Sequence, residues 1–296
     1  MTRADPTLMF CIGATKAGTS WLHFHLAWHP DCHLRTLKEL HYFDTVEKGR
    51  LAERREMIQG MIQSMLGRMP EVGDYMKRKL SVRIEDHGAW EKVLAKGAED
   101  TGAYLGYLCD GLGDRKLVAD ITPGYSLLSE QRLRQMAGIV PDTRFVYLMR
   151  DPLGRLWSHV RMHSQRMRGG DKVDAGHAHK VLARVIKGSP HHRDIAERSD
   201  YRAVLEKMDA AVPRDRRLAM FYEDLFTADG LDRLHDFLGI GPKEADTEKT
   251  IHGGAPADLD PQAAEAARAW LAPQYDYVER RLGALPAAWR AQAAKV

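Results

Sequence analysis

Short apolar runs alternate along the chain with segments in which apolar residues recur at helical spacing. The runs Leu8–Ile12 and Thr143–Met149 are typical of buried strands, and weaker strand patterns lie at 33–35, 116–120 and 217–222. Helical spacing predicts helices at 18–28, 127–136, 152–168, 230–238 and 261–282, and a charged, Met-rich, mostly helical segment at 48–96. Because strands alternate with helices, we expect an α/β fold with three layers, α/β/α, around a mostly parallel central sheet.

The chain shows no internal repeat and no linker that would divide it. Its 296 residues, of which 44% are hydrophobic, suffice for one large domain with a buried core. We therefore expect a single domain over residues 1–296. Two variable helical or loop segments, at 50–115 and 165–200, are expected to shape a binding cleft, and the His-, Arg- and Lys-rich stretch 171–200 is expected at the surface.

The charge balance and the cysteines narrow the classes of function. The chain has 44 basic and 41 acidic residues and a net charge of +3, whereas a dedicated nucleic-acid binder carries a basic stripe. Three cysteines without CxxC spacing predict neither a disulfide framework nor a zinc site, and they favour a reducing compartment. We see no signal-peptide pattern and no run of roughly 20 apolar residues. We expect a cytoplasmic protein with no transmembrane segment and no nucleic-acid partner.

The segment Gly-Ala-Thr-Lys-Ala-Gly-Thr-Ser, residues 13–20, lies between the first predicted strand and the first predicted helix. Glycines at both ends allow a tight turn and close approach to a ligand. Free N–H groups and the dipole at the start of a helix favour an anion there, and the lysine adds a full charge. The predicted anion-binding residues are Thr15, Lys16, Ala17, Gly18, Thr19 and Ser20.

This spacing is close to that of a Walker A loop, G-x-x-x-x-G-K-[ST], with one difference. Thr19 follows the second glycine, and the lysine lies inside the loop at position 16. The difference disfavours a nucleotide triphosphatase, because the missing lysine is the one that reaches the terminal phosphates. Taken alone, the loop is equally compatible with a strand–turn–helix connection and an incidental surface lysine.

A second candidate segment, Leu-Lys-Glu-Leu-His-Tyr-Phe-Asp at residues 37–44, follows the short second strand. Aromatic neighbours can place a carboxylate in a partly apolar cleft, which raises its pKa and suits Glu39 to general-base work. On a strand-like stretch His41 would share a face with Glu39, so His41 is the second candidate. The alternative is a solvated Lys38–Glu39 pair beside a Tyr-Phe core.

A third candidate site begins at Arg150, which follows the clearest predicted strand and lies near the opening of the anion loop. Asp151 suits the N-cap of the next helix, and Pro152 suits its first turn. Ser158 lies about two turns into that helix and shares a face with Arg155. An arginine and a hydroxyl that converge here would hold a second phosphate. The alternative is an Arg150–Asp151 ion pair that closes the turn.

The three segments, in this order, resemble the sulfotransferases that use 3′-phosphoadenosine 5′-phosphosulfate (PAPS). Residues 12–22 are similar to the family's 5′-phosphosulfate loop, residues 145–158 to its 3′-phosphate strand and helix, and residues 119–125 to a further segment that lines the cleft. Residues 222–225 and 237–240 match weaker signatures of the family. Residues 38–44 look most like the branch that includes the heparan sulfate sulfotransferases.

The resemblance implies PAPS as the sulfuryl donor, 3′,5′-adenosine bisphosphate as the product, and no metal. It implies in-line transfer to a hydroxyl or amine, with Glu39 as the base and Lys16 stabilising the leaving group. Lys38 could assist. The implied nucleotide-binding residues beyond the P-loop-like segment are Arg150, Ser158, His252 and Gly253. The last two are only a loose match to a basic, glycine-containing loop that closes over the nucleotide in the family.

The acceptor is left open between a small molecule, a saccharide and a lipid. Basic residues within 161–193 favour a polar or acidic acceptor, whereas methionines between 57 and 76 suit an apolar one, although methionines at helical spacing are more often core. The oligomeric state is also open, with a homodimer as one alternative. The other functional hypotheses are a P-loop-type kinase and a catalytically silent nucleotide-binding protein.

Overall fold

The computed structural model describes residues 6–169, 173–245 and 257–294. In these ranges five strands form one sheet in the order β2-β3-β1-β4-β5, and every neighbouring pair is parallel. The strands are β1 (Thr7–Gly13), β2 (Cys32–His33), β3 (Leu117–Ile121), β4 (Thr143–Met149) and β5 (Arg217–Phe221). The expected parallel sheet is confirmed, although the second strand is shorter and earlier than the predicted 33–35.

β1 lies at the centre of the sheet, paired with β3 on one side and with β4 on the other. Residues 8–13 of β1 are all buried, and so is every residue of β4 except Arg144. Continuous apolar runs of this kind belong to strands that are covered on both faces. Because ligands of open parallel sheets bind beyond the carboxyl ends of the strands, the segments that follow β1 and β4 are well placed for binding.

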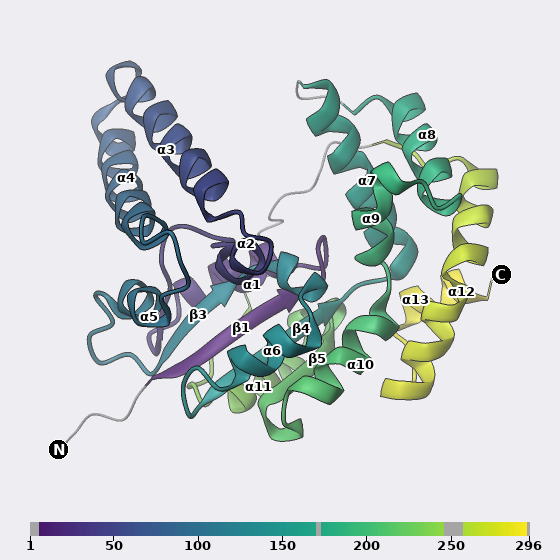
Figure 1. Ribbon diagram of the computed structural model, residues 1–296. Helices are drawn as coiled ribbons and strands as arrows, with labels where there is room; N and C mark the ends of the chain where they lie inside the picture. Colours follow the sequence, from purple (N-terminus) through teal and green to yellow (C-terminus); the bar gives the residue numbers. More distant parts are fainter. Residues whose placement is uncertain (1–5, 170–172, 246–256, 295–296) are drawn as a thin grey trace.

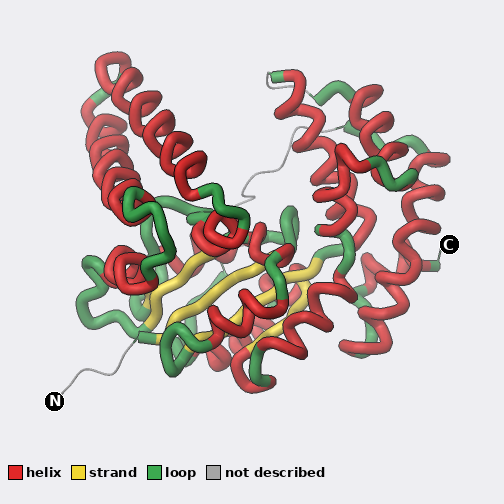
Figure 2. The backbone as a smooth tube through the Cα atoms, viewed as in Figure 1, coloured by secondary structure: helices red, strands yellow, loops and turns green. Residues whose placement is uncertain are grey.

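Helices cover both faces of the sheet and complete the expected three layers (Figures 1 and 2). One layer contains α6 (Glu130–Ala137) and α10 (Tyr201–Ala211). The Tyr201 ring packs against Tyr147 of β4, with the ring centroids 6.1 Å apart. The other layer contains α1 (Thr19–Ala27) and α11 (Ala228–Leu238). A buried hydrogen bond of 2.9 Å between the Nε2 atoms of His25 and His235 joins these two helices.

Two helical units extend from the segments that follow β2 and β4, one on each side of the sheet (Figure 1). The first is a hairpin of α3 (Leu51–Arg68) and α4 (Asp74–Leu94). The second is built from α7 (Pro152–Arg168) and α8 (Ala175–Ile186), with α12 (Pro261–Leu282) packed against both. The shorter helices are α2 (Tyr42–Glu47), α5 (Thr101–Cys109), α9 (Arg193–Glu197) and α13 (Ala287–Ala293).

Several predicted elements are confirmed residue by residue. β4 and α12 have the predicted bounds, and α7 begins at Pro152 as expected. The helix predicted at 127–136 begins later, at Glu130, because Ser129 caps it by accepting a hydrogen bond from the Arg132 N–H, and residues 123–127 form a 3-10 helix instead.

The expectation that 171–200 is a surface segment is wrong for α8. Its residues Ala178, Val181, Leu182 and Val185 are buried. They recur three and four positions apart, which is the spacing of one helix face, so α8 is part of the core. Within the described residues, no helix is both long and apolar enough to cross a membrane.

Candidate active site

The loop at residues 13–20 joins β1 to α1, as the sequence predicts. Ala14 and Ala17 are almost fully buried, so the small side chains of the loop pack against the core. Lys16 and Gly18 adopt left-handed backbone conformations, with φ of 71° and 84°. Gly18 is the N-cap of α1, and no side chain caps this helix. The N–H groups of its first turn are therefore available to a ligand.

Two arginines form hydrogen bonds with Thr15 of the loop, and neither was predicted from the sequence to do so. Arg198 Nη1 donates a hydrogen bond of 2.8 Å to Thr15 Oγ1. Arg155, which is fully buried, donates to the Thr15 carbonyl at 3.4 Å and also to Ser199 Oγ. The shared face of Arg155 and Ser158 therefore does not bring two phosphate ligands together. Arg155 supports the loop instead.

The Tyr222 ring contacts both the anion loop and Arg150. A Cβ atom built on Gly18 would lie 2.3 Å from Tyr222 Cδ2, so the ring packs closely against this glycine. The guanidinium carbon of Arg150 lies 5.6 Å from the centre of the same ring. This distance is typical of a cation–π contact. One aromatic side chain thus contacts both predicted phosphate sites.

Arg150 and Asp151 have different partners, so the alternative of an ion pair that closes this turn is wrong. The Asp151 carboxylate accepts hydrogen bonds from the Gly154 N–H at 2.7 Å and from the Tyr275 hydroxyl at 2.6 Å. It is the N-cap of α7, as predicted. Tyr201 donates to the Arg150 carbonyl at 2.6 Å and fixes the backbone there. The Arg150 guanidinium is left facing the Tyr222 ring.

Positive charge is concentrated around Lys16. Burial and the nearby guanidinium groups of Arg150, Arg161 and Arg166 lower the pKa of Lys16. Within the described ranges, neither Lys16 nor Arg150 forms an ion pair with a carboxylate. Clustered cations of this kind repel one another, and a bound anion relieves the repulsion. Ser158 is 7% exposed and lies on α7.

The Glu39 segment is a turn rather than the strand-like stretch expected from the sequence. Glu39 and His41 both have left-handed backbones, with φ of 63° and 53°. Lys38 Nζ lies 2.7 Å from Glu39 Oε1, and His41 Nε2 lies 3.6 Å from Glu39 Oε2. His41 Nδ1 in turn lies 2.7 Å from Asp44 Oδ2. The turn therefore brings Glu39 and His41 together in a way that strand geometry would not.

The expected rise in the pKa of Glu39 is contradicted. Burial does disfavour the charged carboxylate, but the nearby His41 ring and the charge of Lys38 outweigh it and lower the pKa to about 2. Burial likewise opposes charge on His41, yet the hydrogen bond to Asp44 and the nearby Glu39 carboxylate raise the pKa of His41 overall. The features named as the alternative to a catalytic carboxylate are also present. Lys38 pairs with Glu39, and Tyr42 and Phe43 belong to the core.

Buried polar contacts hold this turn in place. Arg54 of α3 donates to the Glu39 carbonyl at 2.6 Å and to the Leu40 carbonyl at 3.2 Å. Asp86 of α4 accepts from the Leu37 N–H at 2.9 Å. Neither residue was singled out from the sequence. Both lie among other charged residues of α3 and α4, and only the structure shows that these two are buried.

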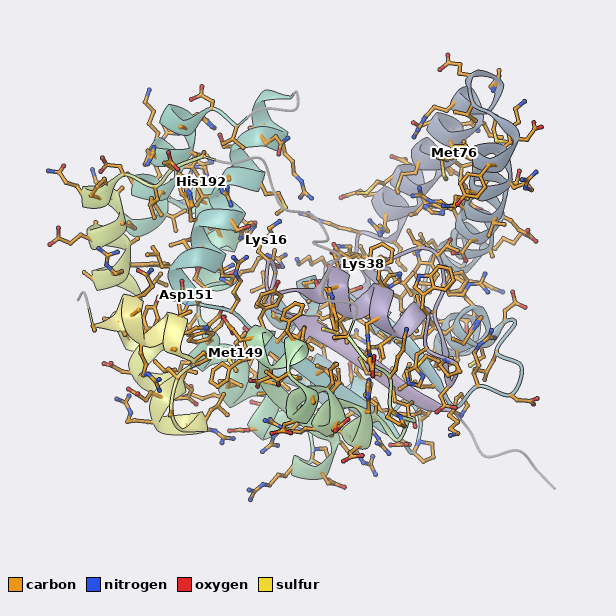
Figure 3. All side chains as sticks on the ribbon, turned by 180° about the vertical axis from the view of Figure 1, so that it is seen from behind. Lys16, Lys38, Met76, Met149, Asp151 and His192 are labelled. Carbon is orange, nitrogen blue, oxygen red and sulfur yellow. The ribbon has the colours of Figure 1, made fainter. Side chains whose placement is uncertain are left out.

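The predicted residues of the three segments therefore meet at one end of the sheet. Figure 3 shows Lys16 and Lys38 there, between the side of the molecule that carries Asp151 and the hairpin that carries Met76. The charge of Glu39 raises the pKa of Lys16 in opposition to the surrounding arginines, which indicates that the two side chains interact. His252 and Gly253 lie outside the described residues. Across the described residues, no group of three His, Cys, Asp or Glu side chains is arranged to hold a metal ion.

Comparison with solved structures supports the fold. A sulfotransferase from Alicyclobacillus acidocaldarius matches with a TM-score of 0.62 and 20% identity, over 97% of this chain and 100% of that one. The sulfotransferase domain of the Synechococcus PCC 7002 olefin synthase matches with a TM-score of 0.51 and 19% identity, over 100% of this chain and 94% of that one. A search of curated proteins finds no significant match.

The sequence also matches a family model over most of its length. The model describes the sulfotransferase family, and the match covers residues 8–242. This range contains β2 to β5, all of β1 except Thr7, the anion loop, the Glu39 turn and the Arg150 segment. The chain belongs to the sulfotransferase family.

Proposed function

We propose that this protein transfers a sulfuryl group from PAPS to a hydroxyl or amine of an acceptor. The observation that carries the proposal is the pair of cationic groups, Lys16 and Arg150, near the Tyr222 ring. Lys16 lies in the loop before α1, and Arg150 lies at the carboxyl end of β4. PAPS presents a 5′-phosphosulfate and a separate 3′-phosphate, and two separate cation sites suit it better than a single triphosphate cradle does.

The residues present fit this donor. The left-handed turn at Lys16 and the uncapped start of α1 suit the phosphosulfate group. Arg150 suits the 3′-phosphate, because an arginine fork forms strong charge-assisted hydrogen bonds with phosphate oxygens. Ser158 is close enough along α7 to add a hydroxyl donor. We assign the remaining contacts of the loop to Thr15, Thr19 and Ser20.

PAPS supplies a sulfuryl group whose bond to the bridging oxygen of the phosphosulfate breaks as the acceptor attacks. Lys16 stabilises the negative charge that grows on that oxygen. Glu39 accepts the proton from the attacking hydroxyl. Because its pKa lies near 2, Glu39 is ionised throughout the neutral range and is a weak base for a free alcohol. A hydroxyl becomes far more acidic as its oxygen bonds to sulfur, so a weak carboxylate base suffices late in the transfer.

His41 and Asp44 act as positioning residues for the base. His41 bridges the two carboxylates, with Nδ1 toward Asp44 and Nε2 toward Glu39. Lys38 holds the other oxygen of Glu39. The Glu39 side chain remains 44% exposed, so it can still reach an acceptor. We further propose a cytoplasmic location, which the three free cysteines fit, and an acceptor that is a small molecule, a saccharide or a lipid.

Calorimetric titration tests this function. We expect 3′,5′-adenosine bisphosphate to bind tightly without magnesium, and ADP and ATP to bind more weakly with or without it, because they lack a 3′-phosphate for Arg150. A preference for ATP in the presence of magnesium would instead identify a kinase and refute the proposal. Tight binding of the bisphosphate with no transfer from PAPS to any acceptor would identify a silent nucleotide-binding protein.

A further inference from the structure

The α3–α4 hairpin exposes an unusual share of apolar side chains. Six of the nine large apolar residues that are exposed in the described part of the chain lie on it. The six are Met57, Met61, Leu66, Tyr75, Met76 and Val82. Single exposed apolar residues need no explanation, but a group of them on one element marks a binding surface. Methionine is especially suited to this role, because its flexible, polarisable side chain adapts to ligands of different shape.

Part of this surface is a groove of about 360 Å³ along α3. Met57, Met61 and Met65 form its apolar wall, and Gly60 and Ser64 leave room beside them. Arg68, the last residue of α3, lines its far end, and Arg83 of α4 lines the groove as well. Neither guanidinium has a carboxylate partner within the described ranges. The groove therefore combines an apolar body with an unpaired positive end.

The near end of the groove reaches the Glu39 turn through one side chain. Arg54 Nη2 donates to the Glu39 carbonyl at 2.6 Å, and Arg54 Nη1 lies 3.2 Å from Met57 Sδ. From Met57 to Arg68 the groove follows eleven residues of α3, or about 16 Å along the helix axis. Figures 1 and 3 show α3 as the helix of the hairpin that lies nearer to α7, across the end of the sheet from it.

We propose that this groove binds the acceptor, and that the acceptor is an elongated apolar chain with a hydroxyl at one end and an anionic group at the other. This inference rests on the proposed sulfotransferase function. The chain lies against Met57 and Met61, the anionic end pairs with Arg68 and Arg83, and the hydroxyl reaches Glu39. The hydroxyl oxygen forms a bond to sulfur, the bond from sulfur to the bridging oxygen breaks, and its electron pair leaves with 3′,5′-adenosine bisphosphate. The hydroxyl proton goes to Glu39.

The size and charge of the groove favour a small amphiphile over other occupants. Its volume falls at the lower end of the range for small-molecule sites, which runs from about 300 to 1,000 Å³. A stable protein–protein interface needs about 800 Å² on each partner, far more than this groove offers. The two arginines that line the groove suit a single anionic group.

Sulfation of ω-hydroxydodecanoate in the presence of PAPS tests the inference. We expect turnover of this probe with a KM at least about tenfold lower than that of its methyl ester, because the ester lacks the charge that pairs with the arginines. We expect ω-hydroxybutanoate, which is too short to span the groove, to be a poor substrate. Equal KM values for the acid and the ester, or for the long and the short acid, would overturn the inference.

Matched variants locate the effect on the protein. Met61→Gln should raise the KM for ω-hydroxydodecanoate, while Met76→Gln, at a similarly exposed methionine outside the groove, should not. Arg68→Gln should abolish the preference for the acid over the ester, while Arg78→Gln, on the exposed side of α4, should preserve it. These positions are exposed, so folding should be retained in all four variants.

The remaining outcomes separate failure of the inference from failure of the proposed function. If 3′,5′-adenosine bisphosphate binds but ω-hydroxydodecanoate is neither sulfated nor bound, the inference falls and the sulfotransferase function stands. If the bisphosphate does not bind, the function itself falls. If Met61→Gln instead abolishes binding to anionic phospholipid vesicles or dissociates a dimer in sedimentation, the occupant is a membrane or a second copy, and the inference is wrong.

Discussion

Substitution of Gly18 by alanine tests whether the anion loop and the Tyr222 ring constrain each other. The backbone φ of 84° lies in the left-handed region, where a side chain costs about 1–2 kcal/mol. The new Cβ atom would also lie 2.3 Å from Tyr222 Cδ2, against 3.4 Å for ordinary contact. Overpacking of this kind costs about 1–3 kcal/mol. We therefore expect the variant to lose about 2–5 kcal/mol of the free energy of unfolding.

Urea unfolding and calorimetry measure the two consequences. With an m-value near 3 kcal/mol/M, the midpoint should fall by about 1 M. The folded variant should bind 3′,5′-adenosine bisphosphate more weakly, because a displaced Tyr222 ring no longer supports Arg150. Gly67→Ala in α3 is the matched control. Its Cβ atom would meet nothing within 4 Å, so it should stabilise the protein by about 0.5–1 kcal/mol.

A second substitution separates the two costs. Tyr222→Leu removes the ring atoms that clash. The double variant should therefore recover the unfolding free energy lost to overpacking, but not the part lost to the left-handed backbone. If Gly18→Ala unfolds at the same urea concentration as the wild type and binds the bisphosphate equally well, then neither the left-handed turn nor the ring constrains the loop. The assignment of two phosphate sites to the anion loop and to Arg150 would then be wrong.

Three further predictions concern the reacting groups. Glu39→Gln should lower kcat about 100- to 10,000-fold and leave the Kd of the bisphosphate unchanged; normal turnover would exclude Glu39 as the base. Arg150→Ala should weaken bisphosphate binding about 10- to 150-fold, with a much smaller effect on adenosine 5′-phosphate in the same titration. His41 has a raised pKa in the folded protein, so its contribution to stability is present below pH 6.5 and is lost as pH rises through that raised pKa. The difference in unfolding free energy between the wild type and His41→Gln should therefore shrink above neutral pH, and a constant difference would contradict the assigned pairing with Asp44.

The part of the fold that could be predicted is the part that local chemistry determines. β4 is a run of β-branched and aromatic residues, and the Asp151-Pro152 pair that follows can only start a helix or a turn. The same holds for the loop after β1, where the glycines, the lysine and the hydroxyls lie next to one another in sequence. These signals fix the ends of β1 and β4, and a parallel sheet then brings the two ends together.

The parts that could not be predicted depend on contacts between distant residues. The left-handed turn at Glu39 and His41 is held by Arg54 and by the Asp44 pairing, so the Glu-x-His spacing alone suggested a strand. Arg198 looked like one more charge in a basic surface segment. It reaches Thr15 only because α8 and α9 fold back onto α7. Charge alone does not distinguish a solvated arginine from one that supports a loop.

The bond between His25 and His235 has a consequence for acid tolerance. Two Nε2 atoms 2.9 Å apart can share only one proton, so the two rings cannot both be charged. Burial and the nearby charge of Lys243 accordingly lower the pKa of His25 to about 3. Below pH 6.5 His25 therefore binds a proton in the unfolded chain but not in the folded one, and the α1–α11 layer loses stability as pH falls. This pH dependence is opposite in sign to that of His41. The contribution of His25 in α1 to stability is lost as pH falls, whereas that of His41 in the Glu39 turn is lost as pH rises.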